Sequence, residues 1–338
     1  MSDAGAEWRR ISRGGVQATL AHAPEWFTVI PRAYGHQPLY FAAEDEAGAC
    51  GLLPAFVVRR PLFGTVVASM PFLDSGGPCA SSPQLMARLI DHLIAEAREI
   101  GARTLEMRAA TPLPIDVPPM RHKVTLTLAL CADHESVWRS LDKDVRNKVR
   151  RAERCGLSID SAGTAHLVEF YDVFAARMRD LGSPVHGLEF LRATLEEFGA
   201  RARVLIVRRR GAPIGGLLAL AFNDTLSVPW AACLREHFHL RPNMLLYWEA
   251  IRAACREGFR RFDFGRSTID SGTYRFKRQW GAREEPLFWY TIPLLGRART
   301  GSTGRAGSMT ALLTGTWQRL PLPLTRRLGP HVRKYLIE

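Results

Sequence analysis

Apolar side chains recur every three or four positions in two segments that lie about 160 residues apart in the chain. The first carries Met86, Leu89, Ile90, Leu93 and Ile94 on one side, and the second carries Met244, Tyr247, Trp248, Ile251 and Ala254. This spacing predicts two amphipathic helices. The first is expected to begin at Ser82-Pro83, a helix cap followed by a first-turn proline, and the second at Arg241-Pro242. A glycine follows each helix, Gly101 or Gly258, as at many helix ends.

The two helices lie within a loose internal repeat. Gly51-Leu52-Leu53 precedes the first helix and Gly216-Leu217-Leu218 precedes the second, each within a hairpin-like block. Each half therefore reads strand, strand, strand, helix, strand, which predicts an α/β (α+β) chain with a mixed, mostly antiparallel sheet in each half. A proline-rich turn at 111–119 and a Gly-, Arg- and Ser-rich stretch after Leu295 suggest the boundaries 1–120, 121–295 and 296–338.

The segment from Glu135 to Arg154 has helical periodicity and two distinct faces. One face carries Val137, Leu141, Val145, Val149 and Ala152, and the other carries Arg139, Lys143, Arg146, Arg150 and Arg154. Several guanidinium groups on one side can bind phosphates. An amphipathic helix also needs a polar face, so the stripe has an ordinary structural explanation as well.

Composition limits the class of protein. The 338 residues are 46% hydrophobic and carry a net charge of +13, so the chain can bury a large core and is expected to meet anionic molecules. An arginine-rich composition explains the same charge without a ligand. The six cysteines stand singly, and no signal-peptide pattern or apolar membrane span is present, which predicts a cytoplasmic protein without disulfides. The histidines lack metal-ligand spacing, so no metal site is expected, and neither a Gly-x-Ser-x-Gly elbow nor a Walker loop occurs.

Several motifs resemble the Fem aminoacyltransferases of peptidoglycan bridges. The likeness rests on the Arg/Lys-rich segment 138–157, the strand 262–265, and Gly272-Thr273-Tyr274-Arg275-Phe276-Lys277-Arg278-Gln279-Trp280-Gly281. In the first half, segments 62–65 and 69–77 are similar to Fem-related proteins of exosortase and exopolysaccharide gene clusters. The likeness covers roughly residues 20–295 and implies two tandem GNAT-like domains. It also implies transfer of an aminoacyl or acyl group to an amine of a cell-envelope or exopolysaccharide precursor.

The resemblance also suggests a site. Lys277 would stabilise the oxyanion, the carbonyl of Phe276 would orient the attacking amine, and Asp263 is a weaker candidate for the general base. Substrate contacts are expected from Lys143, Arg146, Arg150, Tyr274, Trp280, Arg241 and Asn243. For catalysis, Lys277 should face a pocket that Arg146 or Arg150 also reaches. Without the resemblance, Lys277 would be taken for a surface cation, and Phe276 and Trp280 for core or cleft-wall residues.

The donor stays open between aminoacyl-tRNA, acyl-CoA and acyl-carrier protein, with no bound cofactor expected. The stretch 234–243 has no glycine to form a pyrophosphate loop, which weakens the acyl-CoA hypothesis. The sequence also lacks the coiled-coil arm of some Fem enzymes, which weakens the aminoacyl-tRNA hypothesis if that arm helps to bind tRNA. The basic, Trp-bearing tail 309–338 is expected either to fold back over the second domain or to rest on the inner face of the cytoplasmic membrane. A non-catalytic scaffold or a nucleic-acid-binding protein is the alternative, and the oligomeric state is not indicated.

Overall fold

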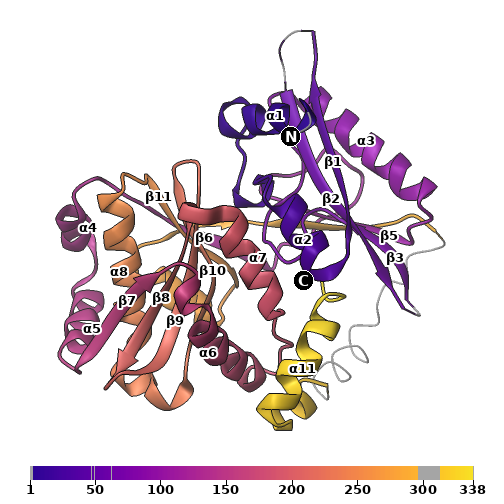
Figure 1. Cartoon of the computed structure of the whole chain (residues 1–338). Coiled ribbons are helices and arrows are strands. Elements are labelled where there is room, and N and C mark those ends of the chain that lie inside the picture. Colours follow the sequence, from indigo (N-terminus) through magenta and orange to yellow (C-terminus); the bar gives the residue numbers. More distant parts are fainter. Residues whose placement is uncertain (1–2, 47, 49, 62, 296–312, 338) are drawn as a thin grey trace.

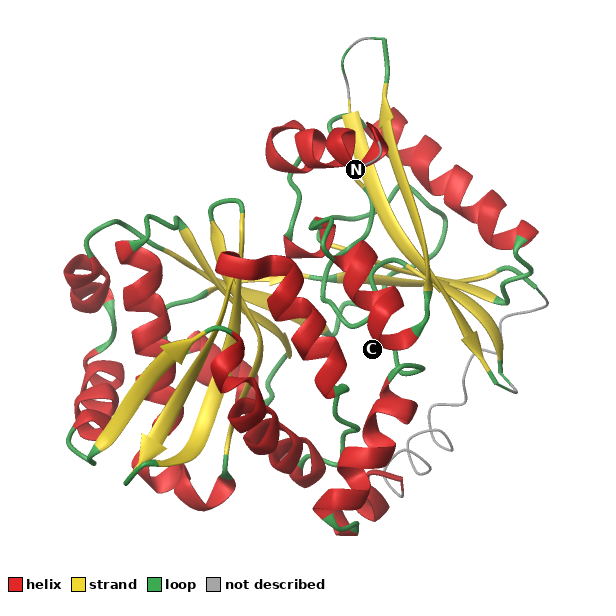
Figure 2. Cartoon of the chain, viewed as in Figure 1, coloured by secondary structure: helices red, strands yellow, loops and turns green. Residues whose placement is uncertain are grey.

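The computed structural model describes residues 3–46, 48, 50–61, 63–295 and 313–337, which form two lobes, each built around one sheet (Figures 1 and 2). The first sheet has the strand order β1-β2-β3-β5-β13, with β4 paired to β2. Its strands are β1 (Gln37–Glu44), β2 (Cys50–Arg60), β3 (Gly64–Ala68), β4 (Cys79–Ala80), β5 (Thr104–Ala109) and β13 (Phe288–Pro293). Its helices are α1 (Asp3–Arg10), α2 (Trp26–Tyr34) and α3 (Pro83–Glu99), with short turns η1 (Ile11–Gly15) and η2 (Leu20–His22).

The second sheet has the order β12-β6-β11-β10-β9-β8-β7. Its strands are β6 (Lys123–Ala129), β7 (Leu157–Ala162), β8 (Ala202–Arg209), β9 (Ala212–Phe222), β10 (Thr225–Cys233), β11 (Arg261–Thr268) and β12 (Arg283–Pro286). Its helices are α4 (His134–Ser140), α5 (Lys143–Glu153), α6 (Leu167–Asp180), α7 (Leu188–Phe198), α8 (Pro242–Arg256) and α9 (Gly272–Arg278). Shorter turns are η3 (Thr164–His166), η4 (Gly199–Arg201) and η5 (Arg235–Leu240).

The predicted repeat is confirmed in the arrangement of the elements. In each lobe a long helix, α3 or α8, leads into a strand that pairs in parallel with a strand that comes earlier in the chain than the helix, β5 with β3 and β11 with β10. Helix α3 begins as expected, because the Ser82 side chain accepts the N–H of Leu85 and Pro83 occupies the first turn. Helix α8 likewise begins at Pro242.

The chain crosses between the lobes near its end. Strand β13 falls within the range expected for the second domain, yet it pairs antiparallel with β5 at the edge of the first sheet. β12, only a few residues earlier, pairs with β6 in the second sheet. Two adjacent strands thus tie the two sheets together covalently.

The predicted single basic helix is in fact two helices. Leu141 has an extended backbone, and the Asp142 side chain accepts the N–H of Asp144 to cap the start of α5. Aspartate at such a position favours a new helix start over a continuous helix. Periodicity alone misses this break, because the apolar positions on both sides stay in phase.

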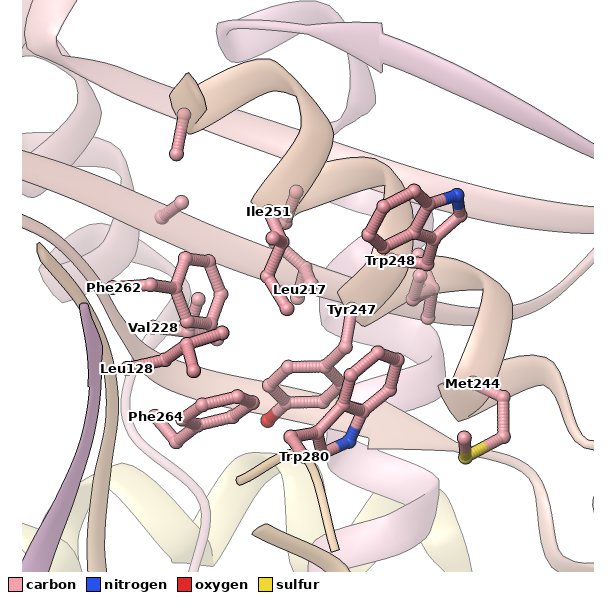
Figure 3. Close-up of a cluster of buried hydrophobic side chains, with 14 of the residues drawn as sticks. Leu128, Leu217, Val228, Met244, Tyr247, Trp248, Ile251, Phe262, Phe264 and Trp280 are labelled. Carbon is pink, nitrogen blue, oxygen red and sulfur yellow. The ribbon is translucent and has the colours of Figure 1, made fainter. Parts of the chain in front are cut away.

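Alternating side chains of the second sheet build two cores. One face packs against α4, α5, α8 and α9, in a cluster that contains Tyr247, Phe264 and Trp280 (Figure 3). The other face packs against α6 and α7 together with Trp26 and Phe72 of the first lobe. Because this second cluster contains residues from both lobes, the lobes share one continuous apolar core.

The tail folds back over the protein rather than standing free. Residues 313–319 are helical, and α11 (Leu322–Arg333) packs against α6. Beyond α11, Ile337 is buried against Val58, Val66 and Ala68 of the first sheet. The tail therefore contacts both lobes. The Gly-, Arg- and Ser-rich stretch 296–308, whose composition is that of a linker, lies outside the described residues. No helix among the described residues is long and apolar enough to cross a membrane.

Candidate active site

A cavity of about 890 Å³ lies between the lobes. The first lobe contributes the segment that follows α1, and the second lobe contributes side chains of β6, β10, β11 and β12. Its lining includes Arg9, Arg13, Thr125, Thr127, Ser227 and Asp263. A smaller hollow of about 40 Å³ shares Thr19, Ser75, Ser227 and Asp263 with it and is also lined by Asp74 and Gly265. Asp263 therefore lies where the two hollows meet.

The hollows lie at a point where two parallel strands separate. Pairing of β10 with β11 runs from Thr225↔Arg261 to Ser227↔Asp263 and then ends. β11 also shifts its register against β6 between Asp263 and Arg266, and Gly265 has φ +73°. Glycine adopts this backbone conformation without strain. The separation leaves the carbonyl oxygens of Gly265 and Arg266 free to accept from side chains instead of from β10.

Lys277 fills this gap between the strands. Its Nζ atom donates to the carbonyl oxygen of Gly265 at 2.9 Å and to that of Arg266 at 2.7 Å. Its exposed fraction is 8%, so it is neither a surface cation nor a group on the wall of either cavity. Burial lowers the pKa of Lys277 to about 8, although the carboxylates of Asp74 and Asp263 act in the opposite direction. The amine is thus charged at neutral pH and close to deprotonation.

Asp263 presents one carboxylate oxygen with few partners. Its Oδ1 atom accepts from Thr125 Oγ1 at 2.8 Å and from the Gly265 N–H at 2.8 Å. Within the part of the chain that the structure describes, its Oδ2 atom receives only a long contact of 3.5 Å, from Ser227 Oγ. Burial raises the pKa of Asp263, and the hydrogen bonds from Gly265 and Thr125 oppose that effect. A desolvated carboxylate beside a cavity, with a free oxygen, is suited to accept a proton.

Asp74 brings the first lobe into the site, and the candidates drawn from the sequence did not include it. Its Oδ2 atom accepts the backbone N–H of Arg266 at 2.9 Å, and its Oδ1 atom lies 3.3 Å from Arg266 Nε. A Cβ atom placed on Gly265 would lie 3.6 Å from Asp74 Oδ2 and 3.8 Å from Lys277 Nζ. The charged side chains of Asp263 in β11, Lys277 in α9 and Asp74 in the loop after β3 therefore lie close to Gly265.

The other predicted catalytic and aromatic residues lie elsewhere. The Phe276 carbonyl accepts from Gln279 Nε2 at 3.0 Å, and its ring packs against Tyr247 and Trp280. Trp280 is fully buried in the core between α8, α9 and the sheet (Figure 3). Tyr274 is also buried, and its hydroxyl donates to Glu284 at 2.7 Å. Tyr274 and Trp280 pack in the core and line neither of these two cavities, and their predicted contact with substrate stays a prediction.

The predicted basic contacts lie on the opposite face of the second sheet. Helix α5, which carries Lys143, Arg146 and Arg150, packs against α8, away from the first lobe (Figure 1). Arg150 stacks over Trp138, and Arg146 donates to the Arg139 carbonyl at 3.1 Å. The expectation that Lys277 and one of these arginines share a pocket is therefore wrong for these two cavities. A role for Lys143, Arg146 and Arg150 in binding some other anion stays a prediction.

Arg241 and Asn243, at the start of α8, are also outside both cavities. Arg241 has φ +59°, and Asn243 Oδ1 accepts from the Cys233 thiol at 2.7 Å. Their role in substrate binding stays a prediction. Among the described residues, no three His, Cys, Asp or Glu side chains gather in a group that would hold a metal ion.

The sequence and the structure of the chain were compared with known proteins. Residues 139–278 match the model of the acetyltransferase (GNAT) domain. FemX is 12% identical, covers 86% of this chain and 97% of its own, and superposes with a TM-score of 0.67. The C-terminal domain of a putative lysylphosphatidylglycerol synthetase from Agrobacterium fabrum is 10% identical, with coverages of 91% and 96% and a TM-score of 0.57.

A tandem GNAT protein from the clavulanic acid biosynthesis pathway is 12% identical, with coverages of 87% and 95% and a TM-score of 0.52. No curated protein matches the sequence. At these identities the structural neighbours establish the fold alone, and they agree with the predicted doubled architecture. The chain thus has a mixed α/β fold with two sheets that matches tandem GNAT-like structures, and its residues 139–278 match the model of the acetyltransferase (GNAT) domain.

Proposed function

We propose that the chain is an acyltransferase that passes an aminoacyl or other acyl group to an amine of a cell-envelope or exopolysaccharide precursor. The observation that carries the proposal is Asp263, which lines an interlobe cavity where β10 and β11 separate and whose Oδ2 atom receives only a 3.5 Å contact from Ser227 Oγ among the described residues. The FemX-like fold supports the choice of reaction class. The cavity of about 890 Å³ is large enough for a substrate of ordinary size.

The chemistry needs one proton acceptor and one source of positive charge. The amine nitrogen attacks the acyl carbonyl carbon, a new C–N bond forms, and the C–O or C–S bond to the donor breaks. Asp263 Oδ2 accepts the proton that the amine loses, and the leaving oxygen or sulfur takes up a proton afterwards. Lys277 lines neither cavity and donates to the carbonyl oxygens of Gly265 and Arg266, so it holds β11 beside Asp263, and its buried charge acts on the developing negative charge through the low dielectric rather than by a direct hydrogen bond.

Three donors remain compatible with the site: aminoacyl-tRNA, acyl-CoA and acyl-carrier protein. The segment that leads into α8 is the short helix η5, with no glycine to bring its backbone close to a pyrophosphate. The absence of glycine in this segment argues against acyl-CoA held by a backbone pyrophosphate loop, and it favours a donor that is bound through other contacts. Acyl-CoA is still included among the donors to be tested, because the name of one tandem GNAT neighbour mentions AcCoA.

Purified protein should be incubated with each donor class and with extracted envelope precursors, and the products weighed by mass spectrometry. We expect a mass increase of one acyl or aminoacyl unit with one donor class. The Asp263→Asn variant should lose the product by about 10²–10⁴-fold, and Asp91→Asn, an exposed residue of α3, should leave it unchanged. A basic scaffold or nucleic-acid-binding protein would give no product with any donor.

A further inference from the structure

One side of α11 carries aliphatic side chains that the described structure leaves partly exposed. Leu324, Leu328 and Val332 stand four positions apart, on one side of the helix, and are 40%, 40% and 39% exposed. Leu313 and Leu336, in the same tail, are 63% and 42% exposed. A single exposed leucine is ordinary, but a row along one helix face indicates a contact surface.

A neighbouring side of α11 is held against the protein, so the apolar row has a fixed direction. Thr325 and Gly329 are buried, and a Cβ atom on Gly329 would come within 2.9 Å of Val185 Cγ1. Arg326 pairs with Asp172 of α6 at 2.6 Å, and Arg333 Nε lies 3.2 Å from His186 Nε2. The row of aliphatic side chains therefore projects outward from a docked helix.

The charge around the row has one sign. Residues 313–337 contain five Lys or Arg residues and no Asp or Glu. Arg327 and His331 are exposed and follow the row at positions i+3 and i+7 from Leu324, so they lie beside it. The nearby acids of α6 are engaged, Asp172 by Arg326 and Asp180 by Arg179.

We propose that α11 is an interfacial helix that docks the protein on an anionic lipid surface, independently of the proposed reaction. An apolar row beside an exposed arginine, in a segment (residues 313–337) that has five Lys or Arg residues and no acid, is the pattern that enters the boundary between headgroups and acyl chains. A second copy of this chain fits less well, because a contact between two identical rows would bring the exposed Arg327 of each copy together, with no acid in residues 313–337 of either copy.

The test is co-sedimentation of the full chain with vesicles of phosphatidylglycerol and phosphatidylcholine in equal parts, and with phosphatidylcholine alone. We expect binding to the mixed vesicles, weaker binding to the neutral ones, and a decrease with added salt. The Leu324→Asp/Leu328→Asp variant should bind the mixed vesicles about tenfold less. Met120→Asp, which places a charge on another exposed apolar residue, should bind as the native chain does.

Thermal unfolding monitored by circular dichroism will show whether the double variant keeps its fold. If the variant is unfolded, Arg327→Glu replaces it, because this side chain is exposed and its reversal should weaken binding by a similar factor. If a folded variant, Leu324→Asp/Leu328→Asp or Arg327→Glu, binds the mixed vesicles as strongly as the native chain does, the proposal is overturned. A dimer, detected by light scattering, that the double variant abolishes, or binding to a nucleic acid but not to the vesicles, would also overturn it.

Discussion

The carboxylate of Asp74 accepts the backbone N–H of Arg266 at 2.9 Å, and the two residues belong to different lobes. Their side chains also form an ion pair, with Oδ1 and Nε 3.3 Å apart. The contact fixes the bulged part of β11 from the first lobe, while Lys277 holds its carbonyl oxygens from α9. The site is therefore held by three elements, and each can be removed separately.

Asp74 and Arg266 should show measurable coupling. We expect a double-mutant cycle with Asp74→Asn and Arg266→Gln to give about 1 kcal/mol in the free energy of unfolding, because both side chains are mostly shielded from water. Urea unfolding of the four proteins provides the value. The pair Arg261 and Glu285, which is more exposed, should give nearer to zero. Equal coupling for the two pairs would speak against a special role for Asp74.

Gly265→Ala should damage both fold and activity. The residue has φ +73°, and its new Cβ atom would lie 3.3 Å from the Val228 carbonyl oxygen. We expect a loss of about 1–2 kcal/mol in the free energy of unfolding, from the backbone conformation alone. Gly272→Ala is the control, since it lies in α9 with ordinary φ and no atom within 4 Å. If both variants unfold at the same urea concentration, the strain assigned to Gly265 is absent.

The burial of Lys277 should appear as a pH dependence of stability. The folded pKa is about 8 and the ordinary value is 10.5, so below pH 8 both states hold the proton and the cost of burial is fully present. Between those values the unfolded chain binds more protons, and stability rises with pH. Between about pH 7 and pH 9.5, the free energy of unfolding of the native protein should rise by about 2 kcal/mol more than that of Lys277→Met. Parallel pH curves for the two proteins would show that the pKa is unshifted.

Acid should destabilise the fold through buried histidines. Burial lowers the pKa of His22 from 6.5 to about 4, and that of His186 moves in the same direction. As the pH falls through this window, the unfolded chain takes up protons that the folded chain excludes, so stability decreases. Between about pH 7 and pH 5, the free energy of unfolding of His22→Gln should fall by about 2 kcal/mol less than that of the native protein. His331→Gln, on the exposed side of α11, should keep the native curve.

The sequence predicts the doubled architecture because helical periodicity and terminal glycines are local signals. Ser82, Pro83 and Gly101 mark the ends of α3 without any knowledge of the fold. The break at Asp142 is missed, because Leu141 continues the apolar phase across it. β13 is equally hard to place, since an edge strand of either sheet has the same apolar alternation.

The candidate site is predicted only in part. Lys277 and Asp263 lie in motifs that can be read along the chain, and they do lie together. Asp74 cannot be found this way, because its place depends on a loop in which Met70 and Phe72 adopt positive φ. Trp280 and Tyr274 illustrate the converse, since an aromatic residue next to a catalytic candidate reads the same whether it lines a cleft or fills a core.

The most direct measurement is mass spectrometry of cell-envelope precursors and glycans from cells that carry the native chain, Asp263→Asn, or no protein. We expect a species heavier by one acyl or aminoacyl unit in the cells with the native chain only, with equal amounts of native and variant protein on immunoblots. Identical precursor profiles in all three strains, or the heavier species at native level with Asp263→Asn, would contradict acyl transfer at this carboxylate.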